Sequence, residues 1–556
     1  MAQTDKTDRE LDELRRREEE ELAMMLSKKY GITYQDLTRL SINTEALRLI
    51  PEEAAREAEV AAFAVVGKKL SLAVRSPQQS KVPILLEDLI KRGFSVEEFM
   101  VSKVSLERAW ERYKDLSFAV ESREGVLDIS PEELKKSIEQ IKTIEDIQRS
   151  VAEVTEMKRA YRISKILEVT LAGAFAIGAS DIHIEPEEAM VRMRYRLDGV
   201  LHNVTDFDSD TYRLLLSRIK LLSGLKLNVK DKAQDGRLSV VLDKKEIDIR
   251  TSVIPGAYGE TVVMRVLDPS SISTPLEKLG MNAKLRELIE REIVKPNGML
   301  INTGPTGSGK TTMLYACLKK VHSPESKIIT IEDPIEYHLP GIVQTQVEEG
   351  KYTFLEGLRS ALRQDPDIIM VGEIRDEEVA RTAIDAALTG HFVFSTLHTN
   401  NAAGTFPRLV DLGVDPKVFG SAISVAMAQR LVRKLCTVCK KQIPLEGEHK
   451  KLVDRIVAGL RDKSEVPADI SNVYGPVGCS ACNGTGFKGR IGVFEAIVVD
   501  TEMDKLLRTE PSEHDIQAIQ QKREIATMLE DGIVKVLNGI TSVEELTRVV
   551  LVEEEA

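Results

Sequence analysis

Short apolar runs recur through the second half of this 556-residue chain, and glycine, a carboxylate or histidine follows each run within two residues. The runs cover residues 298–302, 328–331, 368–371 and 392–397, and helical patterns lie between them. Apolar runs of this length that alternate with helices indicate the buried strands of a parallel sheet. We therefore predict an α/β domain with a parallel sheet over residues 271–556.

A second α/β module is predicted over residues 157–270. It begins with a helical pattern at residues 164–177. Strand-like alternation of apolar and polar positions then follows at residues 182–184, 191–195, 238–241, 247–249 and 262–266. The size of the module and its mixture of elements resemble a PAS-like sensor module.

A smaller α/β domain is predicted over residues 23–120. Residues 63–66 and 70–74 indicate two paired strands across a turn at Gly67, and a helical pattern covers residues 85–93. We expect this small domain to dock onto a partner.

Charged segments occupy the rest of the chain. Residues 1–22 are predicted to form a solvated tail, and residues 121–156 a linker helix between domains. Ser130, Pro131 and Glu133 provide the start signal of that helix, with proline at its first position and a capping box.

The composition is 42% hydrophobic and 30% charged, and the net charge is −12. This acidic balance argues against broad nucleic-acid binding, so we expect no nucleic-acid partner. The longest apolar run, residues 169–179, is shorter than the ~18 residues that a membrane span requires, and residues 4–10 are too charged for a signal peptide. We expect a cytoplasmic protein whose contact with any membrane is peripheral.

Residues 304–311, Gly-Pro-Thr-Gly-Ser-Gly-Lys-Thr, match the phosphate-binding loop pattern G-x-x-x-x-G-K-[ST]. The glycines let the backbone turn tightly and aim its N–H groups inward, Lys310 offers a cation to the β and γ phosphates, and Thr311 can bind Mg²⁺. A strand precedes the loop and a helix follows it, as phosphate binding requires. We predict ATP and Mg²⁺ as ligands of Gly304, Pro305, Thr306, Gly307, Ser308, Gly309, Lys310, Thr311 and Thr312.

Hydrolysis also requires acids near the γ phosphate. The run at 328–331 is followed by Glu332, Asp333 and Glu336, and the run at 368–371 by Glu373. Ligands bind at the carboxyl ends of the strands in such sheets, so these acids should point at the nucleotide. Glu373 ends a Walker B-like strand, where its longer carboxylate suits a hydrated Mg²⁺.

Two histidines lie at the two ends of one predicted strand. His391 precedes the run at 392–397 and His398 follows it. A single histidine is usually a structural hydrogen-bonder, but His398 gains a site role from its position beside the acids.

The segments GPTGSGKTT, ITIEDPIE, LRQDPDIIMVGEIRD and TGHFVFSTLHTN, in this order and spacing, resemble the four signature boxes of the motor ATPases of type II secretion and type IV pilus assembly. The resemblance covers residues 157–556 and implies a RecA-like P-loop core. It implies that Glu336 polarises the attacking water, that Glu373 supports the metal, and that His391 and His398 sense the γ phosphate. Glu373 stays open as the alternative general base.

The resemblance also gives the module at 157–270 a task. In this family the module offers arginines to the nucleotide phosphates, and Arg237, Arg250 and Arg265 lie in matching segments. A guanidinium is always protonated and suits the charge that develops in phosphoryl transfer. The alternative is that these arginines make only structural salt bridges.

Two C-x-x-C pairs, Cys436 with Cys439 and Cys479 with Cys482, lie in a predicted arm at about 433–490. Four thiolates complete a closed tetrahedral site, which predicts structural Zn²⁺. A redox role is the alternative, although neither pair opens a helix after a strand. Cys317 is predicted to be an ordinary buried thiol.

The cysteine arm and the long N-terminal region resemble assembly and secretion motors more than retraction motors. The resemblance implies a homo-hexamer that acts on a polytopic inner-membrane platform protein to drive pilin polymerisation, with type II secretion as the alternative. The N-terminal domain would dock onto a cytosolic or membrane-anchored scaffold. Cyclic di-GMP binding is not expected, because residues 15–21 (RRREEEE) replace the Arg-Leu-Gly segment of binding relatives.

Two functions of other classes stay open. A DNA-processing ring ATPase would share the phosphate loop, but the acidic charge and the lack of aromatic-basic stripes disfavour it. A regulatory module that binds ATP without turnover is disfavoured by the full set of acids and arginines.

Overall fold

The computed structural model describes residues 18–550 apart from 41, 48, 67, 114–130, 156–158, 243–244, 268–273, 349, 521 and 524. The predicted tail therefore lies outside the described residues up to residue 17, and residues 18–30 are helical. Two compact units, residues 1–123 and 124–556, are described separately below. No helix among the described residues is both long and apolar enough to cross a bilayer.

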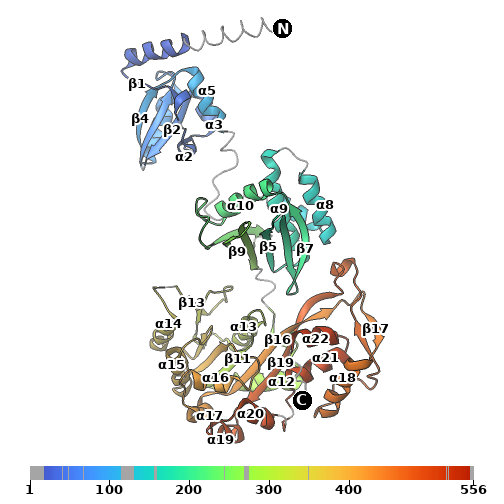
Figure 1. The fold of residues 1–556 in the computed structure, drawn as a ribbon. Helices are drawn as coiled ribbons and strands as arrows, with labels where there is room; N and C mark the ends of the chain where they lie inside the picture. Colours follow the sequence, from blue (N-terminus) through green and yellow to red (C-terminus); the bar gives the residue numbers. More distant parts are fainter. Residues whose placement is uncertain are drawn as a thin grey trace. The chain divides into compact units, whose positions relative to one another are not determined.

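The first unit contains a four-stranded sheet in the order β1-β4-β3-β2 (Figure 1). Its elements are β1 (Thr33–Tyr34), η1 (Leu37–Arg39), α2 (Thr44–Leu47), α3 (Glu52–Glu57), β2 (Val60–Val66), β3 (Lys69–Val74), α4 (Lys81–Lys91), β4 (Ser95–Met100) and α5 (Lys103–Glu111). The predicted pair of strands is confirmed, because β2 and β3 are antiparallel neighbours. Trp110 anchors α5 by donating its indole N–H to Val60 O at 3.0 Å.

The second unit begins with a module built on a six-stranded antiparallel sheet, in the order β7-β6-β5-β10-β9-β8. Its elements are α7 (Pro131–Gln140), α8 (Ile144–Thr155), α9 (Arg159–Ile177), β5 (Asp181–Pro186), β6 (Val191–Leu197), β7 (Val200–Phe207), α10 (Ser209–Leu222), β8 (Gln234–Leu242), β9 (Lys245–Gly256) and β10 (Gly259–Leu267). Buried positions alternate along β6, as in a sheet with one covered face. Strand β7, which is rich in polar residues, was not predicted.

The segment that we expect to be a linker helix forms two helices in its described part. Leu134 of α7 and Ile147 and Val151 of α8 are buried in the same core cluster as the apolar face of α9. Residues 131–155 are therefore part of the module's core, because their apolar positions recur at helical spacing.

The rest of the second unit is built on a seven-stranded sheet in the order β13-β12-β14-β15-β11-β16-β19, parallel except for the antiparallel pair β16 and β19. Its strands are β11 (Gly298–Thr303), β12 (Ile328–Glu332), β13 (Val343–Gln346), β14 (Ile368–Val371), β15 (Phe392–Leu397), β16 (Val425–Leu435) and β19 (Phe487–Val498). Its helices are η2 (Leu276–Lys278), α12 (Ala283–Glu292), α13 (Lys310–Val321), α14 (Phe354–Ala361), η3 (Leu362–Gln364), α15 (Glu377–Leu388), α16 (Thr405–Asp411), η4 (Pro416–Val418), α17 (Phe419–Ala422), α19 (Thr501–Leu507), α20 (Glu513–Gln520), α21 (Met528–Leu537) and α22 (Val543–Val549). This confirms the predicted parallel α/β domain.

An arm extends from β16 and β19. It contains β17 (Lys441–Pro444), α18 (Gly447–Gly459), β18 (Asn472–Gly475) and η5 (Ser480–Cys482), and β17 and β18 pair as a small antiparallel ribbon at one end of this part of the chain (Figure 1). The arm thus begins where β16 ends and finishes where β19 begins.

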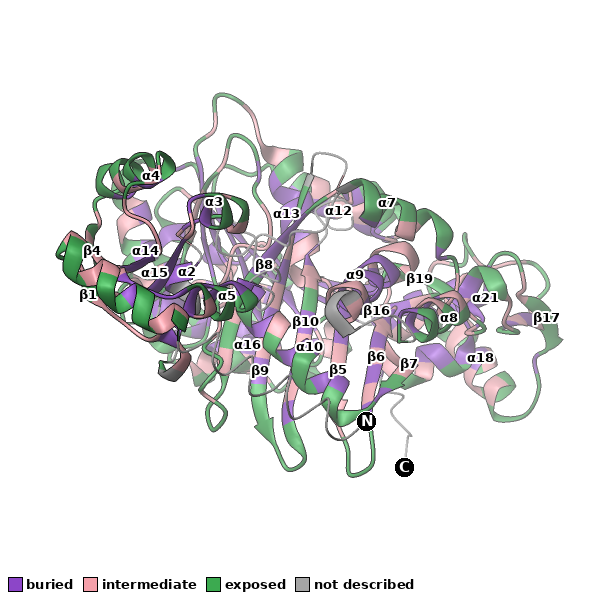
Figure 2. Ribbon diagram, turned by 90° about the horizontal axis from the view of Figure 1, so that it is seen from above, coloured by how far each residue is buried: buried purple, intermediate pink, exposed green. Residues whose placement is uncertain are grey.

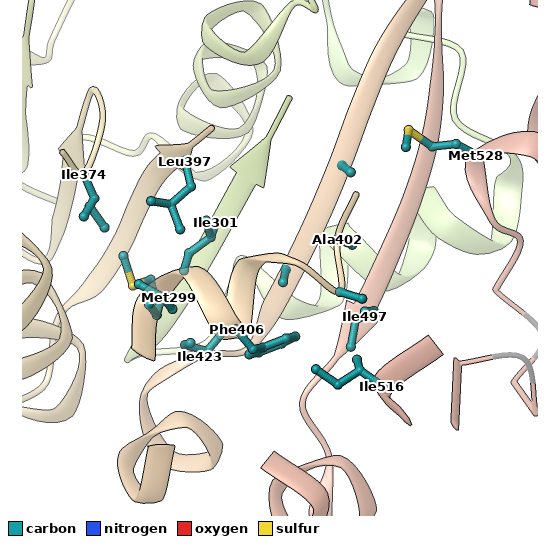
Figure 3. Packing of buried hydrophobic residues seen from close by; sticks show 14 of the residues in the cluster. Met299, Ile301, Ile374, Leu397, Ala402, Phe406, Ile423, Ile497, Ile516 and Met528 are labelled. Carbon is teal, nitrogen blue, oxygen red and sulfur yellow. The ribbon is translucent and has the colours of Figure 1, made fainter. Parts of the chain in front are cut away.

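Helices cover both faces of the large sheet. Along β11, Met299 and Ile301 belong to the core cluster that includes α14, α15 and α16, whereas Leu300 belongs to the cluster with α12 and α13. The outer faces of helices such as α4 and α7 are exposed in Figure 2. The central strands β11, β12, β14 and β15 are buried along their whole length. Figure 3 shows Phe406 of α16 among the labelled core residues beneath the sheet.

Phe406 provides a test of this core. Its side chain is 1% exposed and its ring lies 5.9 Å from that of Phe419. Phe406→Ala should destabilise the domain by about 3–5 kcal/mol, because it removes buried area and leaves a cavity. Scanning calorimetry should show an earlier unfolding transition. Leu388 is 37% exposed, so Leu388→Ala is the control. Equal shifts of the unfolding temperature in the two variants would contradict the packing described here.

Candidate nucleotide-binding site

The phosphate-binding loop joins β11 to α13 and has a conformation that requires glycine. Gly304, Gly307 and Gly309 have φ of 150°, 79° and 90°. A Cβ on Gly304 would lie 2.6 Å from the backbone oxygen of Gln429. Gly309 is the N-terminal cap of α13, so the loop's N–H groups and the positive end of the helix dipole face the same space.

Two polar side chains of the loop are suited to a phosphate. Lys310 Nζ donates to Gly304 O at 2.6 Å, and burial lowers the pKa of Lys310 while the Glu373 charge opposes that shift. The hydroxyl of Ser308 is buried and has no hydrogen-bond partner among the described residues. A buried donor without a partner is costly, and a phosphate oxygen would satisfy it.

Glu373 lies just beyond the end of β14, and both its oxygens are engaged. His398, which follows β15, donates from Nε2 to one oxygen at 3.1 Å. Arg375 forms an ion pair with the other oxygen, and its guanidinium also lies 3.3 Å from Asp333. The carboxylate thus bridges a histidine and an arginine at the carboxyl edge of the sheet.

The acids that follow β12 differ in environment. Glu332 is 3% exposed and accepts hydrogen bonds from the hydroxyls of Tyr315 and Thr330 and from the Gln344 amide. Burial raises the pKa of Glu332, although these hydrogen bonds oppose the shift. The Glu336 side chain is 31% exposed, with one oxygen 3.7 Å from the Arg250 guanidinium.

Many of these residues line a cavity of about 700 Å³, a volume typical of small-molecule sites. Of the sequence-predicted residues, those that line the cavity are Pro305, Thr306, Gly307, Gly309, Lys310, Thr311, Thr312, Glu332, Asp333, Glu336, Glu373, His398 and Arg265. The module also contributes Asp181, which lies 2.9 Å from Arg265 Nε and 3.4 Å from Arg196 Nε. One buried carboxylate therefore holds two cavity-lining arginines.

The predicted residues of the nucleotide site that do not line the cavity are Gly304 and Ser308 of the loop, His391, Arg237 and Arg250. His391 is at the opposite end of β15 from His398, and its Nδ1 donates to Ala386 O at 3.0 Å. Arg237 is 67% exposed and pairs with Asp248, and neither His391 nor Arg237 lines the cavity. Arg250 of β9 donates to Ile335 O at 2.8 Å, so its side chain contacts the loop that carries Glu336.

Sequence reasoning missed Arg375 and Arg196. Arg375 follows Glu373 by two positions, so this short spacing within one segment could have identified it as a partner of the Glu373 carboxylate. Arg196 could not be distinguished from Arg192 and Arg194, because all three alternate along the same face of β6.

The four cysteines of the arm form one cluster. The sulfur of Cys436 lies 3.9 Å from that of Cys479, and Cys482 Sγ lies 3.8 Å from Cys439 and 3.7 Å from Cys479. Four thiolates at about 2.3 Å from a tetrahedral Zn²⁺ would be about 3.8 Å apart, so the spacing fits that ion. Backbone N–H groups also point at the sulfurs, as in the 3.3 Å contact from Gly478 to Cys439.

The fold and the cavity define a RecA-like P-loop nucleotide-binding protein. The family model described as "Type II/IV secretion system protein" matches residues 156–548, and the "MshEN domain" matches residues 30–119. The chain belongs to the type II/IV secretion system protein family.

Similar proteins include a type II secretion system ATPase E from Vibrio cholerae and the type IV pilus assembly ATPase PilB from Myxococcus xanthus. The first is 43% identical over 390 residues, which is 70% of this chain and 75% of the relative. The second is 34% identical over 537 residues, which is 95% of this chain and 91% of the relative. The fold is also that of the ATPase DotB from Yersinia pseudotuberculosis, with TM-score 0.50 and 21% identity over 71% of this chain and 94% of that one.

These relatives establish the general activity. The chain is an ATP-hydrolysing enzyme of secretion or pilus assembly.

Gly304 allows a test of the phosphate loop. Gly304→Ala should weaken nucleotide binding at least roughly tenfold, because a Cβ 2.6 Å from a fixed backbone oxygen must displace the loop. Gly307→Ala is the matched control, since it also strains a positive φ but its Cβ meets no atom within 4 Å. Titration with a fluorescent ATP analogue measures both, and equal affinities would refute the role of the close approach.

Proposed function

We propose that this chain is the motor ATPase of type IV pilus assembly, with the type II secretion ATPase as the alternative. The observation that carries the ATPase assignment is the cavity in which the phosphate loop, Glu336, Glu373 and His398 meet. The pilus assignment is supported by the relative from Myxococcus xanthus, whose similarity extends over 95% of this chain. The alternative is supported by the higher identity to secretion ATPases, which is 43% over 70% of the chain for the relative from Vibrio cholerae and 38% over 86% of the chain for a type II secretion system protein E from Klebsiella pneumoniae.

A deletion in the source bacterium tests this assignment. Loss of surface pili with normal protein export supports the pilus motor, whereas loss of export with normal pili supports the secretion motor. Complementation with a Lys310→Ala variant, which lacks the phosphate-binding cation, should fail in either case.

Glu336 is the proposed general base. Both oxygens of Glu373 already contact His398 or Arg375, whereas the nearest cation to Glu336 is 3.7 Å away. Glu336 therefore retains lone pairs that can accept a proton from water. Glu373, together with the Thr311 hydroxyl, would support Mg²⁺, which supplies charge neutralisation for the phosphates when it is bound.

The module is proposed to close over the nucleotide. Arg265 and Arg196 line the same cavity as the phosphate loop. Arg250 and Arg237 would reach phosphates only after a movement of the module. ATP would favour the closed arrangement because its γ phosphate contacts both parts, whereas ADP lacks that contact. Repeated closure in a homo-hexamer would move an inner-membrane platform protein from the cytoplasmic side.

The N-terminal domain is proposed to dock onto a scaffold protein. Its match to the MshEN domain begins at residue 30, after the acidic segment at residues 15–21. The lack of cyclic di-GMP binding stays a prediction, and a calorimetric titration with cyclic di-GMP tests it.

The base assignment predicts a separation of binding from hydrolysis. Glu336→Gln should lower the rate of phosphate release about 10²–10⁴-fold while ATP binding stays near normal, because the amide cannot accept the proton. Glu373→Gln, the matched variant, should instead raise the Mg²⁺ concentration needed for half-maximal activity. Normal turnover by Glu336→Gln would exclude it as the base.

Structural zinc in the arm is also proposed. The purified protein should contain about one Zn²⁺ per chain, because four thiolates form a closed site. Cys436→Ser with Cys479→Ser should lose the metal and lower the thermal stability of the arm, as atomic absorption and calorimetry would show. Cys317→Ala, outside the cluster, should keep the metal. Full zinc content in the double variant would refute the site.

A further inference from the structure

The loop that carries Glu336 is held by side chains of the edge strand β13. This loop, residues 333–342, connects β12 to β13. Its Leu339 N–H donates to Gln344 Oε1 at 2.6 Å, and Gln344 Nε2 donates to Tyr337 O at 3.2 Å. The same amide therefore binds the loop at two points that follow Glu336 in the chain.

The Gln344 amide also reaches the buried acid beneath the loop. Its Nε2 lies 3.0 Å from Glu332 Oε1 and 3.3 Å from the Tyr315 hydroxyl of α13. Tyr315 donates in turn to the other oxygen of Glu332, and its ring packs edge-on against Tyr337 at 4.6 Å. The helix that begins at the phosphate loop is thus linked through Gln344 to the loop that carries Glu336.

The residue before Glu336 is held from the same strand. Ile335 N–H donates to Gln346 Oε1 at 3.2 Å. Both flanks of Glu336 are therefore fixed by glutamines of β13, and Gln344 also contacts the interior through Glu332.

We propose that Gln344 is a positioning residue that holds Glu336 at the attacking water through the main chain of Tyr337 and Leu339. The proposal rests on the role of Glu336 given above. An amide is required because the position needs one acceptor and donors on the same group. Leucine would leave Leu339 N–H and Tyr337 O without their partner, and a glutamate anion would repel the Glu332 carboxylate.

The first experiment compares Gln344→Leu in two backgrounds. In the otherwise native chain kcat should fall on the order of 10²-fold with ATP affinity unchanged, since small misplacement of a catalytic group costs this much. In the Glu336→Gln background the same substitution should have no further effect, because residues that act as a unit are not additive. Gln442→Leu, the same change on the exposed strand β17, is the control and should leave kcat unchanged.

Two results distinguish the possible failures. If Gln344→Leu lowers kcat equally in both backgrounds, or lowers ATP affinity, the positioning role of Gln344 is overturned while the base assignment of Glu336 stands. Normal turnover by Glu336→Gln would remove the base assignment, and the positioning role would fall with it.

A pH profile gives a second readout. In Gln344→Glu the new carboxyl faces Glu332 on β12, Tyr315 on α13 and Tyr337 in the loop, and burial beside an acid favours its protonated form. Protonated, it can accept from Leu339 N–H and donate one hydrogen bond, whereas the anion can only accept. Relative to the native chain, activity should therefore be retained at low pH and lost as pH rises. A ratio of the two activities that does not change with pH would overturn the proposal.

Discussion

The parallel register of four strands is the constraint on which the site depends. Thr303 at the end of β11 pairs with Leu397 at the end of β15, and Val371 at the end of β14 pairs with Ser395. Parallel strands that end together release their following residues at one edge of the sheet. Segments far apart in the chain therefore bring a glycine turn, a histidine and two sets of acids to the same edge.

Opposite charges keep this edge stable before any nucleotide arrives. Arg375 lies between Glu373 and Asp333, and Asp181 lies between Arg265 and Arg196. Partly buried charges of one sign would be costly if they had no partner. A magnesium nucleotide brings charges of both signs, so it can offer new partners to the carboxylates and the guanidinium groups of these pairs when it binds.

Much of this arrangement follows from the sequence, and its limits have physical reasons. The loop at 304–311 and the acids after the apolar runs can be recognised from short stretches of sequence. Each directly follows a predicted strand, so the end of that strand determines where it lies. The burial of Glu332 is not local, since it depends on hydrogen bonds from Tyr315 of α13 and Gln344 of β13. Likewise, Arg237 and Arg265 lie in similar segments, and only the pairing of β10 with β5 brings Arg265 to Asp181 and the cavity.

The cysteine inventory makes the chain convenient for site-specific labelling. Of its five cysteines, four form the arm cluster and are consumed as ligands when Zn²⁺ is bound. The fifth, Cys317, is fully buried in α13, and burial raises its pKa to about 12, so its thiolate is scarce. Two cysteines, one introduced on an exposed helix of the module and one on an exposed helix of the ATPase domain, would then be the sites that react with a donor and an acceptor maleimide dye. The distance between these two parts of the chain becomes measurable by fluorescence energy transfer.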